Sequence, residues 1–513
     1  MTIMKRLTAF TLMLSASCAL AGVKLPAIIS DHMVVQAGEQ APIWGWADAG
    51  EEISVSLAGQ TATTKSGADG RWQVTLGPMP ATPEPQTLTV EGTNTLTVKD
   101  VLIGEVWLAS GQSNMAFLFS RGEYPPAEAE AAELPGVRMF TVKQHSTRIP
   151  QEDCEGEWVV ASPTTVQDFS AVAWFFGRDL HLKMTTPVGM INSSWGGTDI
   201  AAWTSEEVQE KVPALKTNLE TWAKKGAAYD PATAKKAHDK RLEVWKVQLA
   251  KAKAAGAVKM PPKPRLEGPP LTDPNHPANL YNGMIAPLVP YAVRGAIWYQ
   301  GEHNCSTLEK ATLYATQLPL LVKDWRAKWR VNFPFAWVQL PNFEHVGYRP
   351  LVREAMLKSL AVPNTGMAVT IDVGEADDNH PKDKKTVGER LSLWAQARVY
   401  KQKVPAYSGP TVRTHEVKNG TVQVRFDNAQ GGLKLKDETA RGFEIAGADK
   451  QWKPARVKIT SNLLVLSHPE IKEPAAARYA WASNPEVSLY NTAGLPASPF
   501  RTDDWEITEP KKP

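Results

Sequence analysis

Short apolar segments alternate with segments of helical periodicity between residues 104 and 403. Such alternation is typical of βαβ units, in which helices cover both faces of a parallel sheet. The expected helices include Ala171–Lys183 and Ala311–Lys328. The expected strands are Glu105–Ala109, Val137–Val142, Pro187–Asn192, Ala292–Tyr299, Phe335–Leu340 and Met367–Asp372. We therefore predict an α/β domain with a doubly wound parallel sheet.

Two-residue alternation replaces this pattern on both sides of the α/β region. It occurs in Ile53–Leu57 and Trp72–Leu76 near the N-terminus and in Thr421–Phe426 near the C-terminus. Alternation of this kind is typical of half-buried strands, and short strands separated by turns favour a sandwich. We expect an N-terminal β-sandwich domain at 22–103, the α/β domain at 104–403, and a C-terminal β-rich domain at 404–513.

An insertion at about 205–275 interrupts the α/β pattern. Leu215 and Trp222 share one face of a predicted helix, and Leu242 and Leu249 share one face of a second. Lysine and alanine fill many of the other positions, which is typical of solvated helical faces. We expect an inserted helical hairpin on the α/β domain.

The first 21 residues match a secretory signal peptide. Lys5 and Arg6 precede the apolar stretch Leu7–Leu14, and Ala19-Leu20-Ala21 forms a small-x-small cleavage site. The apolar stretch is too short to span a bilayer. We expect an exported protein, periplasmic or extracellular, with no membrane span.

Two cysteines remain after such a cleavage, Cys154 and Cys305. Export would permit one disulfide between them, whereas two separate buried thiols fit the sequence as well. There is no Cys-x-x-Cys motif, which argues against a zinc ribbon or a dithiol redox site.

The chain of 513 residues has a formal net charge of +3. This charge is too slight to indicate binding to nucleic acid or to a membrane surface. The 18 tryptophans are more informative, because aromatic rings pack against sugar rings as well as filling cores. Carbohydrate is therefore a candidate partner.

One serine lies directly after an expected strand. The apolar run Val106–Ala109 is followed by Ser110-Gly111-Gln112-Ser113, and Gly111 permits a sharp backbone turn. Reactive groups in open α/β sheets sit just past the carboxyl ends of strands. We predict that Ser113 is a nucleophile.

Three further polar clusters follow strands of the same domain, at Asn192–Thr198, Trp298–Asn304 and Asp372–Pro381. The carboxyl ends of parallel strands share one edge, so these clusters should converge with Ser113.

The third cluster offers the partners that a serine nucleophile needs. A serine hydroxyl requires a base within hydrogen-bond reach, and His380 is the best candidate. A carboxylate must orient the imidazole and stabilise its charged form. Asp377 and Asp378, three and two residues before His380, could each reach the imidazole around a tight turn.

A tetrahedral oxyanion also needs hydrogen-bond donors that are already in place. The candidates are the backbone N–H of Ser113, a glycine N–H at Gly197 or Gly196, and the side chain of Gln300. Three further polar residues are expected to support the site or contact substrate: Gln112, Asn114 and Glu302.

Several motifs together resemble a known family. They are Ser30–Gln36, Trp44–Ala47, Gly104–Trp107, Gly111–Met115, Trp195–Thr198, Trp298–Glu302, His380-Pro381, Tyr479–Ala482 and Gly494–Phe500. The sequence resembles the sialate O-acetylesterases within the SGNH (GDSL-like) hydrolases, over nearly the whole chain after the signal peptide.

The resemblance implies an SGNH-type sheet between helices and a metal-independent serine esterase that removes acetyl groups from sugar hydroxyls. It also implies a nucleophile at Ser113 and a base at His380. The wider superfamily places an aspartate three residues before the histidine, which falls on Asp377. Closer relatives often show Asp-Ile-His, which aligns Asp378, and this chain carries both residues.

Two departures from the family pattern concern substrate preference. His303 stands where relatives often have serine, and Asn379 replaces an aliphatic residue.

Other functions stay open beside this one. The same machinery would serve an acetyl-xylan or other polysaccharide acetylesterase. A non-catalytic surface protein could instead bind carbohydrate through its β domains. A metal hydrolase is a weaker alternative, because the chain has no His-x-His or His-Glu-x-x-His motif. We expect an acetylated sugar or oligosaccharide as substrate, with no cofactor and no metal.

Overall fold

The computed structural model describes residues 22–257, 260–344 and 347–507. The predicted signal peptide at 1–21 lies outside these residues. None of the helices in the described ranges is long and apolar enough to cross a membrane.

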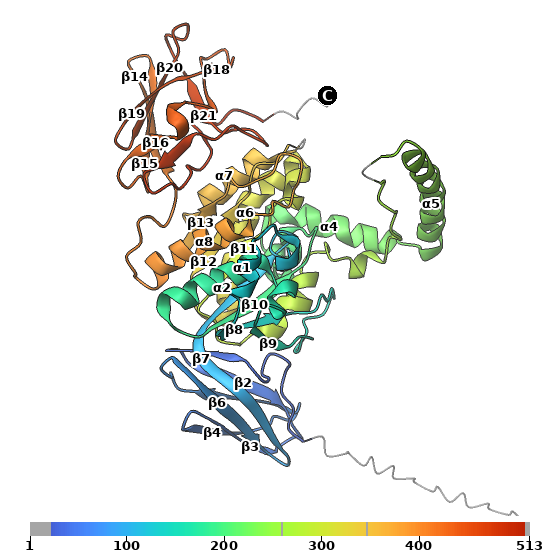
Figure 1. Ribbon diagram of the computed structural model, residues 1–513. Helices are drawn as coiled ribbons and strands as arrows, with labels where there is room; N and C mark the ends of the chain where they lie inside the picture. The colour runs from blue at the N-terminus through green and yellow to red at the C-terminus, as the bar shows by residue number, and fades with distance from the viewer. Residues whose placement is uncertain (1–21, 258–259, 345–346, 508–513) are drawn as a thin grey trace, which may run out of the picture.

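A twisted sheet forms the centre of the molecule (Figure 1). Its strands in spatial order are β13 (Thr365–Val369), β12 (Phe335–Gln339), β11 (Gly295–Tyr299), β7 (Thr95–Gly111), β10 (Val188–Ser194), β8 (Leu134–Thr141) and β9 (Trp158–Ala161). The first six pair in parallel, and only the edge strand β9 is antiparallel. The predicted doubly wound α/β arrangement is therefore confirmed.

The order of the strands reverses at the centre of this sheet. β7 lies between β10 and β11; the chain reaches β8 and β10 on one side and β12 and β13 on the other. Ligand sites in such sheets lie beyond the carboxyl ends of the strands at this reversal. The ends of β7 and β11 are therefore where a site is expected.

Helices cover both faces of the sheet. α2 (Ala171–Met184) packs with α8 (Lys384–Trp394), and α6 (Leu308–Trp329) packs with α7 (Arg349–Ser359). Trp107 of β7 meets Phe176 of α2 at a ring-centroid distance of 4.9 Å, and Trp298 of β11 meets Trp325 of α6 at 5.8 Å. Trp298 lies opposite Ser110, an odd number of residues from Trp107, so the two tryptophans point to opposite faces.

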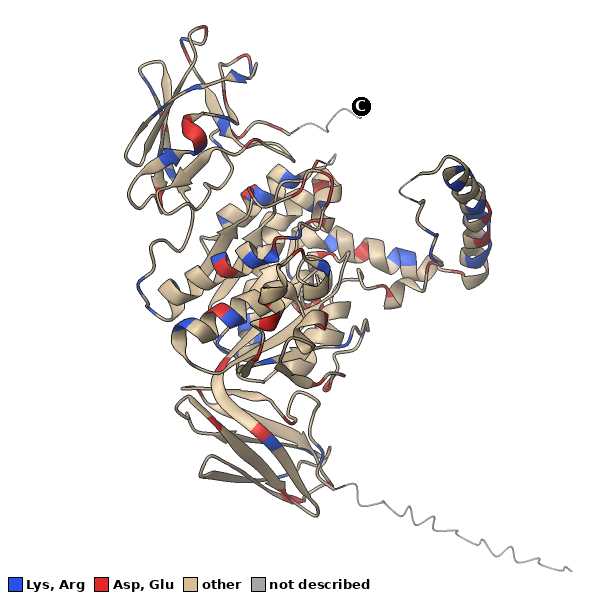
Figure 2. Ribbon diagram, in the orientation of Figure 1, with Lys and Arg blue, Asp and Glu red and all other residues tan. Residues whose placement is uncertain are grey.

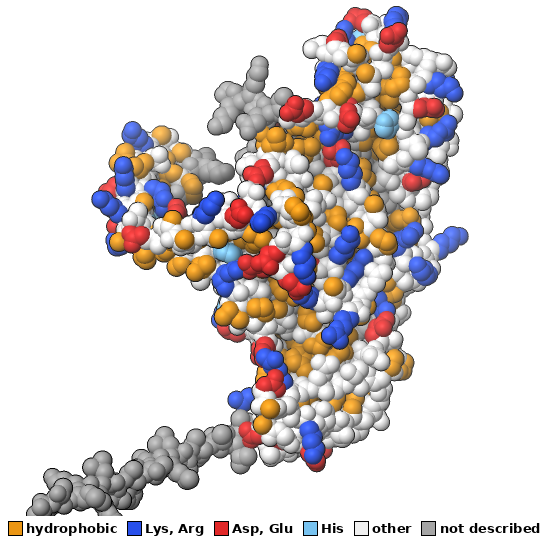
Figure 3. Space-filling view, turned by 180° about the vertical axis from the view of Figure 1, so that it is seen from behind, with side chains coloured by type: hydrophobic (Ala, Val, Ile, Leu, Met, Phe, Trp, Pro, Cys, Tyr) orange, Lys and Arg blue, Asp and Glu red, His pale blue; other side chains and the backbone are white. Residues whose placement is uncertain are grey.

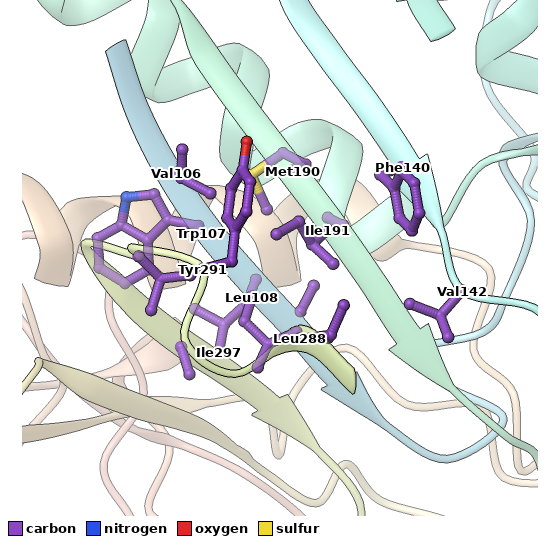
Figure 4. Close-up of a cluster of buried hydrophobic side chains, with 14 of the residues drawn as sticks. Val106, Trp107, Leu108, Phe140, Val142, Met190, Ile191, Leu288, Tyr291 and Ile297 are labelled. Carbon is purple, nitrogen blue, oxygen red and sulfur yellow. The ribbon is translucent and has the colours of Figure 1, made fainter. Parts of the chain in front are cut away.

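The core between these layers is continuous and apolar. Figure 4 shows part of it, where side chains of β7, β8, β10 and β11 pack with the segment that carries Leu288 and Tyr291. Trp107 and Trp298 are both fully buried. Trp298 therefore serves the core and is not available to line a sugar site.

Strand β7 joins the N-terminal β region to the central parallel sheet. Its first part pairs with β6 (Thr82–Glu91) and with β1 (Val34–Gln36), and its second part pairs with β10 and β11. Four more strands complete the N-terminal region: β2 (Ala41–Trp46), β3 (Glu52–Leu57), β4 (Gln60–Lys65) and β5 (Arg71–Leu76). The expected domain boundary at 103/104 thus falls inside one strand of 17 residues, and the buried side chains on its two sides form one hydrophobic cluster.

The insertion is helical as expected, but its helices do not lie side by side. It contains α3 (Glu206–Glu210), α4 (Pro213–Ala228) and α5 (Pro231–Ala254). In Figure 1 α5 runs across the far end of α4, and no residue of α5 is fully buried. The expected hairpin is therefore wrong as a packing arrangement.

One side chain on the apolar face of α5 contacts the chain that returns to the body. The Trp245 indole N–H donates to the Pro261 carbonyl at 2.8 Å. Lysine and arginine outnumber acidic residues along α5 (Figures 2 and 3), as expected for the solvated face that the lysine-rich sequence predicts.

The C-terminal region has its own core. One sheet contains β14 (Thr411–Lys418), β15 (Thr421–Asp427), β20 (Leu463–Ser467) and β19 (Arg456–Thr460); another contains β18 (Lys453–Pro454), β17 (Phe443–Ala446), β21 (Ala476–Tyr479) and β23 (Phe500–Arg501). Arg353 of α7 joins this region to the α/β sheet. It is fully buried and donates to the carbonyls of Leu340 and Pro341 and to those of Ala482 and Ser483.

Candidate active site

A sharp turn at the end of β7 presents Ser113. Gly111 has a φ of +139°, and a Cβ at this position would lie 2.1 Å from the Tyr299 carbonyl oxygen. Only glycine permits both this backbone conformation and this close approach. The next residue, Gln112, donates its backbone N–H to the same carbonyl at 2.9 Å. Ser113 therefore stands just beyond the strand end, half-buried.

His380 lies directly opposite this serine. It comes from the loop between β13 and α8, and its Nε2 is 2.8 Å from the Ser113 Oγ. The imidazole is 39% exposed. The structure thus brings together two residues that are 267 positions apart, as the convergence of strand ends predicts.

The two candidate acids are placed differently. One Asp378 carboxylate oxygen accepts the His380 backbone N–H at 2.8 Å and lies 3.6 Å from the imidazole Nδ1. A separation of 3.6 Å is an ionic contact but too long for a hydrogen bond. Asp377 is exposed, and the interactions of the described residues include no hydrogen bond or ion pair to its carboxylate. Asp378 is therefore the carboxylate beside the ring.

Backbone N–H groups are available near the serine. The N–H of Ser113 has no hydrogen-bond acceptor among the described residues, and the same holds for the N–H groups of Gly196 and Gly197. A Cβ on Gly196 would lie 3.1 Å from the Ser113 Cβ, whereas one on Gly197 would meet nothing within 4 Å. Gly196 is thus the glycine that packs against the serine, and Gly197 follows it with a φ of +75°.

Gln300 does not point a free donor at this site. Its side-chain amide donates to the Thr198 carbonyl at 2.9 Å and to the Asn304 Oδ1 at 2.7 Å. An amide group has two N–H bonds, and both are used. The prediction that Gln300 donates to the oxyanion is therefore wrong for this arrangement, because its fully buried side chain instead joins the loops after β10 and β11.

Gln112 and Asn114 connect the serine turn to its neighbours. The Gln112 side-chain carbonyl accepts the His303 backbone N–H at 3.2 Å. The Asn114 amide donates to a Glu302 carboxylate oxygen and, at 3.0 Å, to the Asn379 carbonyl. Because Asn379 precedes His380, these contacts tie the nucleophile turn to the loop that carries the candidate base.

The sequence reasoning missed Lys384. Its ammonium group donates to the Asn114 Oδ1, and its side chain is fully buried. Burial lowers the pKa of this lysine to about 7, and the negative charge of Glu302 acts in the opposite direction. A signal was present, since Val387 and Leu391 follow Lys384 at helical spacing on the buried face of α8.

Three other features bear on the chemistry of the site. Within the described ranges no group of three or more His, Cys, Asp or Glu side chains is arranged to hold a metal ion. Cys154 and Cys305 are separate free thiols. Trp195, next to Gly196, is partly exposed.

Comparison with known proteins gives a consistent result. A family model described as carbohydrate esterase, sialic acid-specific acetylesterase, matches residues 269–395. The sialate O-acetylesterases of Rattus norvegicus and Mus musculus are 31% and 29% identical to this chain, and both alignments cover 93% of this chain and 94% of the relative. The crystal structure of a carbohydrate acetylesterase from Xanthomonas citri shares 34% identity with a TM-score of 0.78, covering 94% of this chain and 100% of that chain.

The similarity therefore extends far beyond the active-site loops. It includes the β-rich regions on both sides of the α/β sheet, because it covers nearly the whole of both chains. The chain belongs to the sialate O-acetylesterase family and is a carboxylic ester hydrolase that removes O-acetyl groups from carbohydrate.

Proposed function

We propose that Ser113, His380 and Asp378 carry out acyl transfer from an acetylated sugar. The observation that carries this proposal is the distance of 2.8 Å between the Ser113 Oγ and the His380 Nε2. A hydroxyl and an imidazole at this distance can exchange a proton as the nucleophile attacks.

In the first half-reaction the Ser113 Oγ bonds to the acetyl carbonyl carbon while His380 takes the hydroxyl proton. The resulting oxyanion accepts hydrogen bonds from the N–H of Ser113 and from that of Gly196 or Gly197. His380 then gives the proton to the departing sugar oxygen, and the C–O ester bond breaks. Asp378 stabilises the imidazolium that exists between these two proton transfers. We expect the distance of 3.6 Å between the Asp378 carboxylate and the His380 Nδ1 to shorten when substrate binds.

In the second half-reaction water attacks the acetyl-enzyme. His380 takes a proton from the water and returns it to the Ser113 Oγ as acetate leaves. No cofactor takes part in either step, which is the route of other serine hydrolases.

We further propose that the acetylated sugar is a sialic acid. The support is the name of the mammalian relatives, which cover 93% of this chain. An acetylated plant polysaccharide is the second candidate, because the Xanthomonas citri relative is described only as a carbohydrate acetylesterase.

Export and superfamily membership also remain proposals. Residues 1–21 have the sequence of a signal peptide, and an exported enzyme would meet glycans outside the cytoplasm. The strand order and the Ser–His pair support an SGNH-type fold.

Acetate release from acetylated sialic acids, acetyl-xylan and acetylated pectin fragments tests the substrate. An aryl acetate tests the chemistry independently of the sugar. We expect Ser113→Ala to lower kcat/KM on the aryl acetate by about 10⁴-fold or more, with Ser193→Ala as a matched control. Near wild-type turnover by the Ser113 variant would refute the serine mechanism.

A further inference from the structure

A buried lysine contacts the turn that carries Ser113. Lys384 is the first residue of α8, four positions after His380, and its side chain is fully buried. Its ammonium lies 4.7 Å from the centre of the Phe117 ring and 5.6 Å from that of Tyr299. Among the described residues it has no carboxylate within ion-pair distance, and its one hydrogen bond goes to the Asn114 Oδ1.

This bond fixes the orientation of the Asn114 amide. The ammonium form of Lys384 only donates, so in that form the amide atom that faces it is the oxygen. The amide nitrogen then faces the Glu302 carboxylate and the Asn379 carbonyl, and both of these accept. A half-turn of the amide would place its N–H bonds against the ammonium and its oxygen against two acceptors.

We propose that Lys384 is a positioning residue for the acyl transfer: it locks the Asn114 amide, which holds the serine turn and the His380 loop in register. The role rests on the proposed function of Ser113 and His380. Lys384 acts through Asn114 and does not contact the reacting atoms.

The charges around Lys384 fit a role that stability alone does not explain. Glu302 faces it from the loop after β11, and Glu375, Asp378 and Asp383 face it from the His380 loop. Their attraction does not offset the cost of burial, since the pKa remains well below the ordinary value for lysine. Replacing a buried charge of this kind by an apolar side chain of similar volume is often neutral or stabilising. Within the described residues, the one hydrogen bond of this buried amino group goes to Asn114, which points to a role at the serine turn.

The first test compares Lys384→Met with Lys382→Met on the aryl acetate. Lys382 lies on the same loop, but its ammonium is exposed and paired with Glu123. We expect Lys384→Met to lower kcat by at least 30-fold, with KM within twofold of wild type and a Tm that is unchanged or higher. We expect the control to stay within twofold in kcat.

A double-mutant cycle with Asn114→Ala tests the route of the effect. If Lys384 acts through Asn114, the double variant should be no slower than the slower single variant, within about threefold. If the kcat losses of the two single variants multiplied in the double variant, the proposal would be overturned. A wild-type kcat in Lys384→Met would also overturn it, as would a kcat loss in that variant accompanied by a lowered Tm. If Ser113→Ala kept its activity, the proposed function would fail instead; an inactive Ser113→Ala with a fully active Lys384→Met would overturn only the role of Lys384.

Discussion

The choice between two adjacent carboxylates gives the sharpest test of the proposed mechanism. Asp378→Asn removes the charge that lies 3.6 Å from the His380 Nδ1 and preserves the size of the side chain. Asp377→Asn makes the same chemical change one residue earlier, at an exposed carboxylate that, within the described residues, makes no hydrogen bond or ion pair to the ring. The pair is therefore a matched comparison.

The magnitude follows from Coulomb's law. Two unit charges at this distance attract by about 1 kcal/mol in a medium as polar as water and by about 5 kcal/mol at an effective dielectric constant of about 20. The Asp378 side chain is 45% exposed and that of His380 is 39% exposed, so screening favours the lower part of this range. About 1.4–2.8 kcal/mol of imidazolium stabilisation corresponds to a rate loss of roughly 10-fold to 100-fold.

Initial rates of aryl acetate hydrolysis at a saturating concentration and at a low concentration give kcat and kcat/KM for each variant. We expect Asp378→Asn to lower both by 10-fold to 100-fold, because the imidazolium exists only after the serine has been deprotonated. Asp377→Asn should stay within twofold of wild type. A larger loss in Asp377→Asn than in Asp378→Asn would refute the assignment of the orienting acid.

Four further outcomes follow from the structure. Gly196→Ala should lower kcat by about 10²-fold or more in the same assay, because the added methyl would lie 3.1 Å from the Ser113 Cβ, where the oxyanion must form; an unchanged kcat would remove this glycine from the site. Arg353→Met should destabilise the protein by about 2–4 kcal/mol in urea unfolding, because it leaves four carbonyls without their donor, of which those of Leu340 and Pro341 are buried; no change in the unfolding midpoint would contradict this. Burial raises the pKa of the Cys305 thiol to about 12, so peptide mapping after iodoacetamide treatment at pH 8 should find it unlabelled until the protein is unfolded. Lys384 has a pKa of about 7 in the folded protein against an ordinary value of 10.5. Between these two pH values the unfolded state binds more protons than the folded state, so the stability of the wild type rises with pH. The difference in Tm between Lys384→Met and the wild type should therefore narrow from about pH 7 to about pH 10.

The sequence predicted which loops form the site, but not which side chains in those loops take each role. Apolar strands that end in glycine and polar residues predict where Ser113 and the His380 loop must meet, because parallel strands share one carboxyl edge. The choice between Asp377 and Asp378 depends on how a short loop turns, and no periodic pattern encodes that. Gln300 was misassigned because its residue type suits an oxyanion donor, whereas its two N–H bonds go to Thr198 and Asn304.

The pattern of hydrophobic positions also could not predict how the helices and strands pack against one another. Both apolar faces of the insertion were visible in the sequence, but periodicity does not state which surface covers each face; Trp245 of α5 hydrogen-bonds to Pro261. The boundary was expected at 103/104 because the all-β pattern gives way there to alternating strands and helices. In the structure Asp100 has a φ of +55° and its carboxylate pairs with the buried Arg138, so the strand continues through this residue.

The long strand β7 has a consequence for dissecting the enzyme. A truncated chain that begins at residue 104 would keep the half of β7 that leads to the nucleophile but would lose the half that pairs with β6. One hydrophobic cluster extends across residue 104, so the truncated chain and the removed N-terminal segment would each expose apolar side chains that are buried in the whole protein. The N-terminal sandwich is thus not an independent folding unit, and limited proteolysis should fail to release it intact. A chimera that exchanges this region between relatives would have to include the whole of β7.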